Sequence, residues 1–214
     1  MTLILASASP RRASLLSSIG LKFDVIPSNV DESDIKTTSI MESIAKLAAR
    51  KASTISALHP NAFVIAADTV VLVPSFATQE QWSKGGGRIF GKPVDTQDAF
   101  EMLNKLQGIT HSVISGFCLA NKSIDYCKSR TVQTDVEFSP MTPAEIRAYV
   151  ASGEPEDKAG AYAIQGIGGA FIRKINGSYT NVVGLPMAEV IEELKACKIS
   201  YLQYSTEKSA GPGE

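Results

Sequence analysis

The chain has 214 residues, of which 44% are hydrophobic and 20% are charged, and its formal net charge is −1. This composition is typical of a globular protein with a sizeable core, and the near-neutral charge excludes a general electrostatic attraction to nucleic acid or to anionic membranes. Two histidines and three widely spaced cysteines exclude a histidine-rich or paired-cysteine metal site, so a metal ion would be a hard cation bound by carboxylates.

The first predicted element is a short buried strand at residues 3–6. A helix follows, with Ser9 as its N-cap, Pro10 at its first position and Gly20 after its end. The apolar run is too short for a signal peptide, and no other apolar stretch approaches the roughly 20 residues that span a bilayer. We therefore expect a cytoplasmic protein without a membrane span.

The next segment predicts a strand, a loop, a helix and a second strand. The strand is expected at residues 23–26, and an acidic loop at 29–34. Ser39 and Glu42 form a capping-box pattern that opens a long amphipathic helix. The apolar run 62–73 then predicts a central strand that is buried on both faces.

The middle of the chain begins with a polar, Gly-rich segment at residues 74–91, which predicts a mobile surface excursion. Asp95 or Thr96 caps the helix that follows. Two strands are then expected, at 112–120 and 130–138, because apolar and polar residues alternate along the second of them.

The last third of the chain opens with Thr142-Pro-Ala-Glu145, which combines an N-cap, a proline and a glutamate in the positions of a capping box and predicts a helix. Residues 171–175 with the turn Asn176-Gly177 predict a hairpin, and Pro186 starts a final helix.

This mixture of helices and strands indicates an α/β or α+β fold with a mixed sheet. We expect one domain over residues 1–204. The polar tail at 205–214 is predicted to be disordered.

Two arginines, Arg11 and Arg12, lie in the first turn of the first predicted helix, where the helix dipole disfavours cations. Together with the free backbone N–H groups of that turn and the hydroxyls of Ser7 and Ser9, they could form an anion site. The alternative is that both arginines reach solvent or a carboxylate.

Two more charged residues stand where apolar ones are expected. Lys51 lies on the apolar stripe of its helix, and either extends to solvent or points its ammonium group into an interior cleft. Asp68 lies inside the apolar run of the central strand, where a carboxylate is costly unless it is paired, hydrogen-bonded or bound to metal. A structural partner is one explanation, and a functional role is the other.

Three further polar residues occur in predicted loops. Glu32 lies in the acidic loop and Lys92 lies beside the Gly-rich segment, and simple exposure would explain both. Gln165 lies among glycines and alanines, which either let the backbone approach a ligand or pack tightly.

Several segments together resemble, in order, the motifs of the Maf family, and they span about residues 2 to 198. The segments are Ala6-Ser-Ala-Ser-Pro-Arg-Arg12 with Leu15-Leu16, Asp31-Glu32, Ala67-Asp-Thr-Val-Val71, Gly91-Lys-Pro93, Gly153–Gly166 and Asn176–Pro186.

This resemblance implies an inosine-triphosphatase-like fold, with a long mixed sheet flanked by helices and two lobes that enclose a cleft. It implies a hydrolase acting on acid anhydrides, a nucleoside triphosphate pyrophosphatase. The segments Pro10–Arg12 and Asp157–Gln165 resemble the branch that hydrolyses dTTP and UTP. Modified pyrimidine triphosphates are further candidate substrates, a homodimer is a candidate assembly, and the family implies clearance of unwanted nucleotides with a link to cell division.

The resemblance also implies roles for single residues. Asp68 would be the catalytic group that takes a proton from the attacking water, and Glu32 and Asp68 would hold Mg²⁺ or Mn²⁺. Substrate binding and specificity would fall to the remaining positions that match the family, which are Ser7, Arg11, Arg12, Lys51, Thr69, Lys92 and Gln165. Of these, the arginines and lysines would clamp the polyphosphate, and Thr69 and Gln165 would read the base or the sugar.

Two rival functions remain. An enzyme of the same fold could instead hydrolyse purine triphosphates such as ITP or XTP. The protein could also be a non-catalytic, nucleotide-binding regulator of septum formation, but that interpretation leaves the acid at position 68 unexplained.

Overall fold

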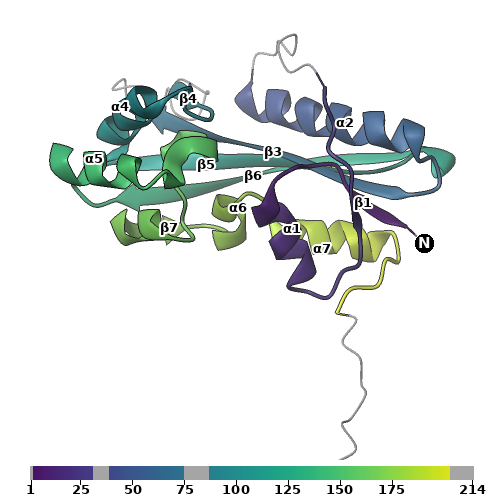
Figure 1. The fold of residues 1–214 in the computed structure, drawn as a ribbon. Helices are drawn as coiled ribbons and strands as arrows, with labels where there is room; N and C mark the ends of the chain where they lie inside the picture. The colour runs from purple at the N-terminus through teal and green to yellow at the C-terminus, as the bar shows by residue number, and fades with distance from the viewer. Residues whose placement is uncertain (1, 31–38, 75–86, 203–214) are drawn as a thin grey trace, which may run out of the picture.

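The computed structural model describes residues 2–30, 39–74 and 87–202, in which strands and helices are interspersed along the chain (Figure 1). The strands are β1 (Leu3–Leu5), β2 (Asp24–Val25), β3 (Phe63–Pro74), β4 (Gly87–Phe90), β5 (Thr110–Asn121), β6 (Tyr126–Phe138) and β7 (Ile172–Asn176). The helices are α1 (Pro10–Ser17), α2 (Ile40–Leu58), α4 (Thr96–Leu106), α5 (Pro143–Ala151), α6 (Tyr179–Val183) and α7 (Met187–Ala196).

The strands form one seven-stranded sheet in the order β2-β1-β3-β5-β6-β7, and β4 pairs with β3 outside this order. β1 is parallel to both β2 and β3, whereas β5 is antiparallel to both of its neighbours, β3 and β6. The mixed sheet flanked by helices that the sequence predicts is therefore confirmed. The long hairpin β5–β6 confirms the two strands expected at 112–120 and 130–138, and extends both.

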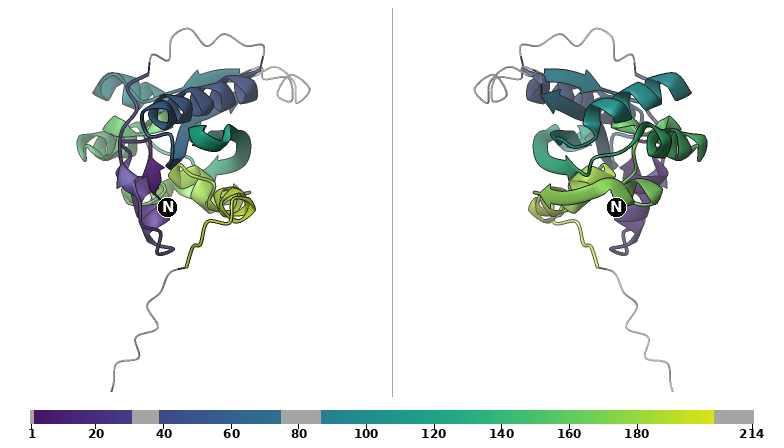
Figure 2. Two further views of the ribbon diagram at one scale, coloured as in Figure 1. Left: turned by 90° about the vertical axis from the view of Figure 1, so that its right-hand side faces the viewer. Right: turned by 90° about the vertical axis from the view of Figure 1, so that its left-hand side faces the viewer.

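Helices cover both faces of the sheet, which explains why β3 is apolar along most of its length and why every residue of β5 except the first is buried (Figures 1 and 2). α2 covers one face and packs its alanines on Val64 and Ala66. The opposite face carries two separate cores. One surrounds Ile65 with α1 and α7, and the other surrounds Val71 with α4 and α5. Two cores on one long sheet form the two lobes expected from the sequence.

The edge of β3 that faces β1 is paired at both of its ends. β1 pairs with residues 63–65, and β4 pairs with residues 71–74 on the same side, because β5 occupies the other side. Within the described residues, no strand pairs with residues 66–70 on this side. Asp68 and Thr69 therefore lie at a gap in the sheet edge that is open to solvent and to side chains from other elements.

The helix caps follow the sequence closely at three places. α1 begins after Ser9 with Pro10 at its first position, α4 is capped by the Asp95 carboxylate, which accepts from the N–H of Asp98, and the predicted capping box of Thr142 opens α5.

Three expectations were wrong. The capping box of α2 does not form: the Ser39 side chain makes no capping hydrogen bond, and the Glu42 carboxylate pairs with Lys46 at 2.7 Å. Residues 87–90 are not part of a surface excursion but form β4. After the turn at Gly177 the chain enters α6 rather than a second strand, so β7 pairs with β6 and makes no hairpin of its own.

Other expectations lie outside the described residues, namely the acidic residues 31–34, most of the Gly-rich segment and the polar tail. Among the helices in the described ranges, none is long and apolar enough to cross a membrane.

The approach of α2 to the sheet depends on Gly116 of β5, which lies directly opposite Asp68. A Cβ atom at this position would lie 2.7 Å from Cγ2 of Ile44 and 2.8 Å from its carbonyl oxygen, and both are atoms of α2. Because part of this contact is with backbone, α2 would have to move away from the sheet to admit a methyl group.

We therefore expect Gly116→Ala to lower the free energy of unfolding by about 1–3 kcal/mol, the usual cost of overpacking a core. Gly91→Ala is the matched control, because a Cβ there meets no atom within 4 Å and should change stability by less than about 0.5 kcal/mol. Denaturant unfolding monitored by circular dichroism measures both values. Equal stability of the two variants would contradict the close packing of α2.

Candidate active site

A cavity of about 510 Å³ opens at the gap in the edge of β3 and lies between the two lobes. Its walls come from the start of α1, from β3, from the residues after β4, from residues 157–165 and from the end of α6. The cavity contains seven of the residues predicted from the sequence, which are Ser7, Arg11, Arg12, Asp68, Thr69, Lys92 and Gln165. Lys51 reaches this set through Asp68, and Glu32 lies outside the described residues.

Asp68 and Lys51 form a short ion pair, in which Nζ of Lys51 lies 2.9 Å from Oδ1 of Asp68. The Lys51 side chain is 12% exposed and the Asp68 side chain is 20% exposed, so solvent screens the pair only in part. The second alternative for Lys51 is therefore correct: it points inward from α2 rather than to solvent. A carboxylate has about four acceptor sites, so this bond leaves Asp68 able to accept from a water molecule or to bind a cation.

Arg12 uses its guanidinium group to bind the protein itself. Its Nε donates to the carbonyl of Gly184 at 2.8 Å, and Nη1 donates to the carbonyl of Ala67 at 2.8 Å and to Oγ of Ser7 at 3.1 Å. Nη2 donates to Oγ1 of Thr69 at 3.1 Å. These four bonds join α1, β3 and the end of α6 around one planar group.

The bond to Ala67 explains how the gap in the sheet edge is tolerated. Alternate carbonyls along a strand point the same way, so Ala67 and Ile65 present their oxygens to the same edge. The carbonyl of Ile65 accepts from the backbone N–H of Ala6 at 2.7 Å. The carbonyl of Ala67 accepts instead from Arg12, which takes the place of the next donor of a neighbouring strand.

Ser7 completes this arrangement beneath the start of α1. Its Oγ accepts from Arg12 and from the backbone N–H of Ser9 at 3.2 Å, so neither bond uses its hydroxyl hydrogen. Ser9 occupies the N-cap position of α1, but its side chain makes no capping hydrogen bond.

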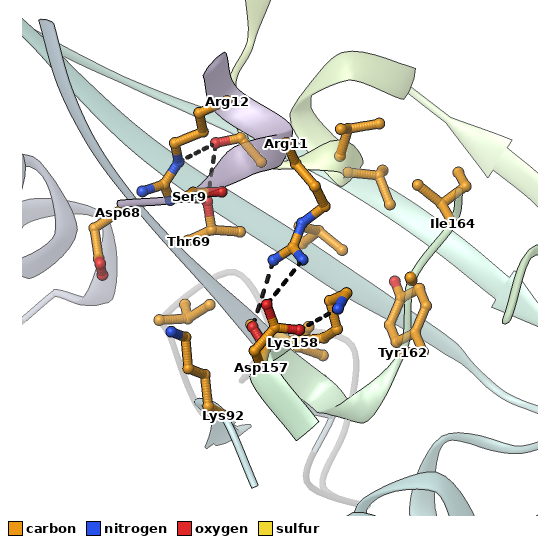
Figure 3. A pocket seen from close by; sticks show the side chains of 18 of the residues that line it. Ser9, Arg11, Arg12, Asp68, Thr69, Lys92, Asp157, Lys158, Tyr162 and Ile164 are labelled. Atoms are coloured by element: carbon orange, nitrogen blue, oxygen red, sulfur yellow. Dashed lines mark hydrogen bonds and ion pairs between the residues drawn. The ribbon is translucent and has the colours of Figure 1, made fainter. Parts of the chain in front are cut away.

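Arg11 behaves differently from its neighbour and extends across the cavity to Asp157 (Figure 3). Its Nη1 lies 3.5 Å from Oδ2 of Asp157, and its Nη2 donates to the Asp157 carbonyl at 3.4 Å. Lys158 also pairs with this carboxylate. The hydrogen bond from Lys158, and the charges of Lys158, Arg11 and Lys92, hold the pKa of Asp157 below its usual value. Arg11, Lys92 and Lys158 therefore form a group of cations around Asp157, and a polyanion bound there would make charge-assisted hydrogen bonds with them.

The loop that carries Gln165 is fixed by Glu154. The Glu154 carboxylate accepts from the backbone N–H groups of Ile167 and Gly168, both at 2.9 Å, and from the hydroxyl of Tyr149 at 2.8 Å. Gly166 has φ of 131°, a conformation that favours glycine, and the carboxylate occupies the space where a Cβ would lie. Gly166, next to Gln165, is therefore needed because a larger residue would collide with the Glu154 carboxylate.

The far wall of the cavity is largely apolar and includes Tyr162 and Ile164 (Figure 3). The Tyr162 hydroxyl lies 2.8 Å from Nε2 of His111, which is fully buried. Burial lowers the pKa of His111 to about 3, so its ring is neutral at pH 7 and serves to hold Tyr162 in place. One side of the cavity therefore suits a polyanion and the other suits a flat, uncharged group.

The described residues of the cavity would supply only some of the ligands that a metal ion needs. Among the described residues, no group of three or more His, Cys, Asp or Glu side chains is placed to bind one ion. Asp68 has a hard oxygen donor exposed to the cavity and fits Mg²⁺ or Mn²⁺ as one ligand.

Sequence reasoning did not single out Asp157, Lys158 and Tyr162 as site residues. Asp157 and Lys158 begin the motif that ends at Gln165, so the motif itself was a signal. Tyr162 carried no signal apart from its place in that motif, because only the fold brings its ring to the cavity.

Comparison with known proteins shows which proteins this chain resembles. A protein-family model described as Maf-like protein matches residues 2–197. A dTTP/UTP pyrophosphatase of Syntrophus aciditrophicus is 46% identical over 90% of this chain and 88% of its own length, and one of Clostridium perfringens is 43% identical over 94% and 100%. The solved structure of the Staphylococcus aureus Ham1 protein has a TM-score of 0.48 and 17% identity, covering 90% of this chain and 100% of that one.

The bonds of Arg12 predict that a lysine cannot replace it. Arg12→Lys keeps the charge but loses the planar fork, so at least one carbonyl among those of Ala67 and Gly184 loses its donor. We expect the free energy of unfolding to fall by about 1–3 kcal/mol. Arg11→Lys changes the neighbouring arginine, whose contacts with Asp157 are longer at 3.4 and 3.5 Å, and should have an effect below about 0.5 kcal/mol. If both variants unfold at the same denaturant concentration, Arg12 does not hold the site together.

Proposed function

The chain belongs to the Maf family, and we propose that it is a pyrophosphatase that hydrolyses dTTP and UTP to the nucleoside monophosphate and pyrophosphate. The observation that carries this proposal is one cavity that contains an acid on its polar side, a group of cations beside it and an apolar wall opposite. A triphosphate fits the cations, and a pyrimidine base fits the apolar wall.

Asp68 is the residue that we propose as the proton acceptor. Water attacks the α-phosphorus, its proton passes to the Asp68 carboxylate, and pyrophosphate leaves with the bonding electrons. Lys51 supports this step because its ammonium group holds the carboxylate at Oδ1. The same ammonium group compensates part of the negative charge that a bound triphosphate brings close to Asp68.

Arg11, Lys92 and Lys158 are the cations that we propose for the phosphate groups. All three line the cavity and surround Asp157, so a bound polyphosphate replaces that carboxylate as their partner. Arg12 has another role in this proposal than the direct clamp expected from the sequence. Its four bonds to the protein fix Ser7, Ala67, Thr69 and Gly184, and so keep the cavity open.

Thr69 and Gln165 are proposed to contact the nucleoside part of the substrate, because both line the cavity. Glu32 and Asp68 are proposed to hold Mg²⁺ or Mn²⁺. When bound there, such an ion would neutralise charge that develops on the phosphate oxygens. A cytoplasmic location and a homodimer stay predictions from the sequence.

Replacement of Asp68 tests the proposed chemistry directly. Asp68→Asn keeps the size of the side chain but cannot take a proton, so we expect kcat for pyrophosphate release from dTTP to fall by about 10²–10⁴-fold. Binding of the nucleotide should persist. Asp125→Asn is the matched control, because Asp125 lies in the turn between β5 and β6 with φ of 50°, a conformation that asparagine also adopts. Wild-type turnover in Asp68→Asn would exclude this residue as the proton acceptor.

A panel of triphosphates tests the substrate class. We expect pyrophosphate release from dTTP and UTP to exceed that from ITP and XTP, and to stop when EDTA removes divalent cations and to return with Mg²⁺ or Mn²⁺. Faster turnover of ITP or XTP would favour the purine alternative. Tight binding of dTTP without any turnover would favour a regulatory role, and full activity in EDTA would contradict the metal.

A further inference from the structure

Ser115 lies behind the cavity, on β5, and was not singled out by the sequence or by the family motifs. It is the direct cross-strand partner of Thr69 on β3, so both side chains emerge on the same face of the sheet. Its hydroxyl lies 2.8 Å from Oγ1 of Thr69, and the residue is fully buried. Ser115 therefore contacts a residue of the cavity wall without facing the cavity itself.

The hydroxyl of Thr69 has several neighbours but only one hydrogen to donate. Arg12 donates to it at 3.1 Å, so on that side Thr69 acts as an acceptor. Ser115 can accept or donate at 2.8 Å, and the carbonyl of Gly184 can only accept, at 3.4 Å. Because a hydroxyl has one hydrogen and two lone pairs, the behaviour of Ser115 decides what Thr69 can offer to a ligand.

Two arrangements of this pair follow. If Ser115 donates to Thr69, both lone pairs of Thr69 are used, and its hydrogen is shared between the carbonyl of Gly184, at 3.4 Å, and a ligand in the cavity. If Ser115 donates instead to the carbonyl of Asn181, at 3.4 Å, it accepts from Thr69, and Thr69 presents a lone pair. In both cases the 2.8 Å bond fixes the rotamer of Thr69.

Ser115 is itself held in a rigid position. The fully buried Asn181 of α6 donates from Nδ2 to the carbonyl of Val113 at 3.1 Å and to Oγ1 of Thr134 at 3.0 Å. These bonds tie α6 to the paired residues Val113 of β5 and Thr134 of β6, two positions along β5 from Ser115. A buried and connected set of this kind has little freedom to rearrange when a ligand enters.

We propose that Ser115 is a positioning residue of this site, which orients the Thr69 hydroxyl toward the nucleoside part of the substrate. This inference rests on the proposed function. It predicts that Ser115 acts only through Thr69, and that removing its hydroxyl weakens the recognition of substrate more than it weakens the fold.

A double-mutant cycle tests this coupling. The variants are Ser115→Ala, Thr69→Val and the two combined, and kcat and KM are measured with dTTP and UTP. We expect Ser115→Ala to lower kcat/KM by about tenfold, mainly through KM, and to have no further effect when Thr69 is already valine. Full additivity of the two changes, or an unchanged kcat/KM in Ser115→Ala, would overturn the proposal.

Ser112→Ala is the matched control for a purely structural effect. Ser112 is a buried serine of the same strand, but its Oγ bonds to Asp135 and Gln133 on the other face of the sheet. We expect both serine variants to melt within a few degrees of each other and Ser112→Ala to keep its kcat/KM. An equal loss of kcat/KM in the two variants would show that Ser115 acts through the stability of β5.

The same cycle is measured as binding of the α,β-imido analogue of dUTP by calorimetry, so that it does not depend on turnover. If the wild-type protein binds this analogue but releases no pyrophosphate from dTTP or UTP, the proposed function fails, while the coupling between Ser115 and Thr69 is still measured. If turnover is normal but binding shows no coupling, the inference about Ser115 fails alone.

Discussion

On one side of β3, the first residues pair with β1 and the last residues pair with β4, but no described strand pairs with the middle, where the carbonyl of Ala67 lies. A strand edge within the protein must find donors for its carbonyls, and here the donor is the guanidinium group of Arg12 at 2.8 Å. The same group reaches Ser7, Thr69 and Gly184, so the element that satisfies the edge also joins the walls of the cavity. The cavity exists because β1 pairs only with residues 63–65 of β3 and β4 only with residues 71–74, so neither strand covers the middle of β3.

This constraint explains why two adjacent arginines have different surroundings. Consecutive residues on a helix point about 100° apart, so only one of them can face the edge of β3. Arg12 faces it, and Arg11 extends across the cavity to Asp157. The chain carries a net charge of only −1, so any attraction for phosphate comes from the local placement of Arg11, Lys92 and Lys158 and not from the composition.

The sequence predicts those parts of the structure that depend on local rules. The start of α1 at Pro10 and the capping box at Thr142 follow from neighbouring residues, and both are confirmed. Asp68 stood out because a carboxylate in an apolar strand needs a partner, and Lys51 is that partner. The capping pattern at Ser39 is not realised: the Ser39 side chain makes no capping hydrogen bond, and Glu42 pairs with a lysine one turn along the helix.

The bonds of Arg12 could not be predicted in the same way, because their acceptors lie up to 172 residues away in the chain. Ser115 gives no local signal either, since a serine in an apolar strand is common. Only the register of β3 against β5, which pairs Thr69 with Ser115, identifies its role.

The alternation of side chains along β3 divides the site into two functions. Asp68 and Thr69 are consecutive, so they point to opposite faces of the sheet. Asp68 shares its face with α2, where Lys51 holds the carboxylate, and Gly116 lets that helix approach. Thr69 shares its face with α1 and α6, where Arg12 and Ser115 hold its hydroxyl.

In a continuous sheet these two faces would be separated by the strands themselves. The gap at the edge of β3 removes that separation, so that one cavity reaches both the acid and the residues proposed to recognise the substrate. A shift of β3 by one residue would exchange the two faces, which is why the register of this strand is as important to the site as the identity of its residues.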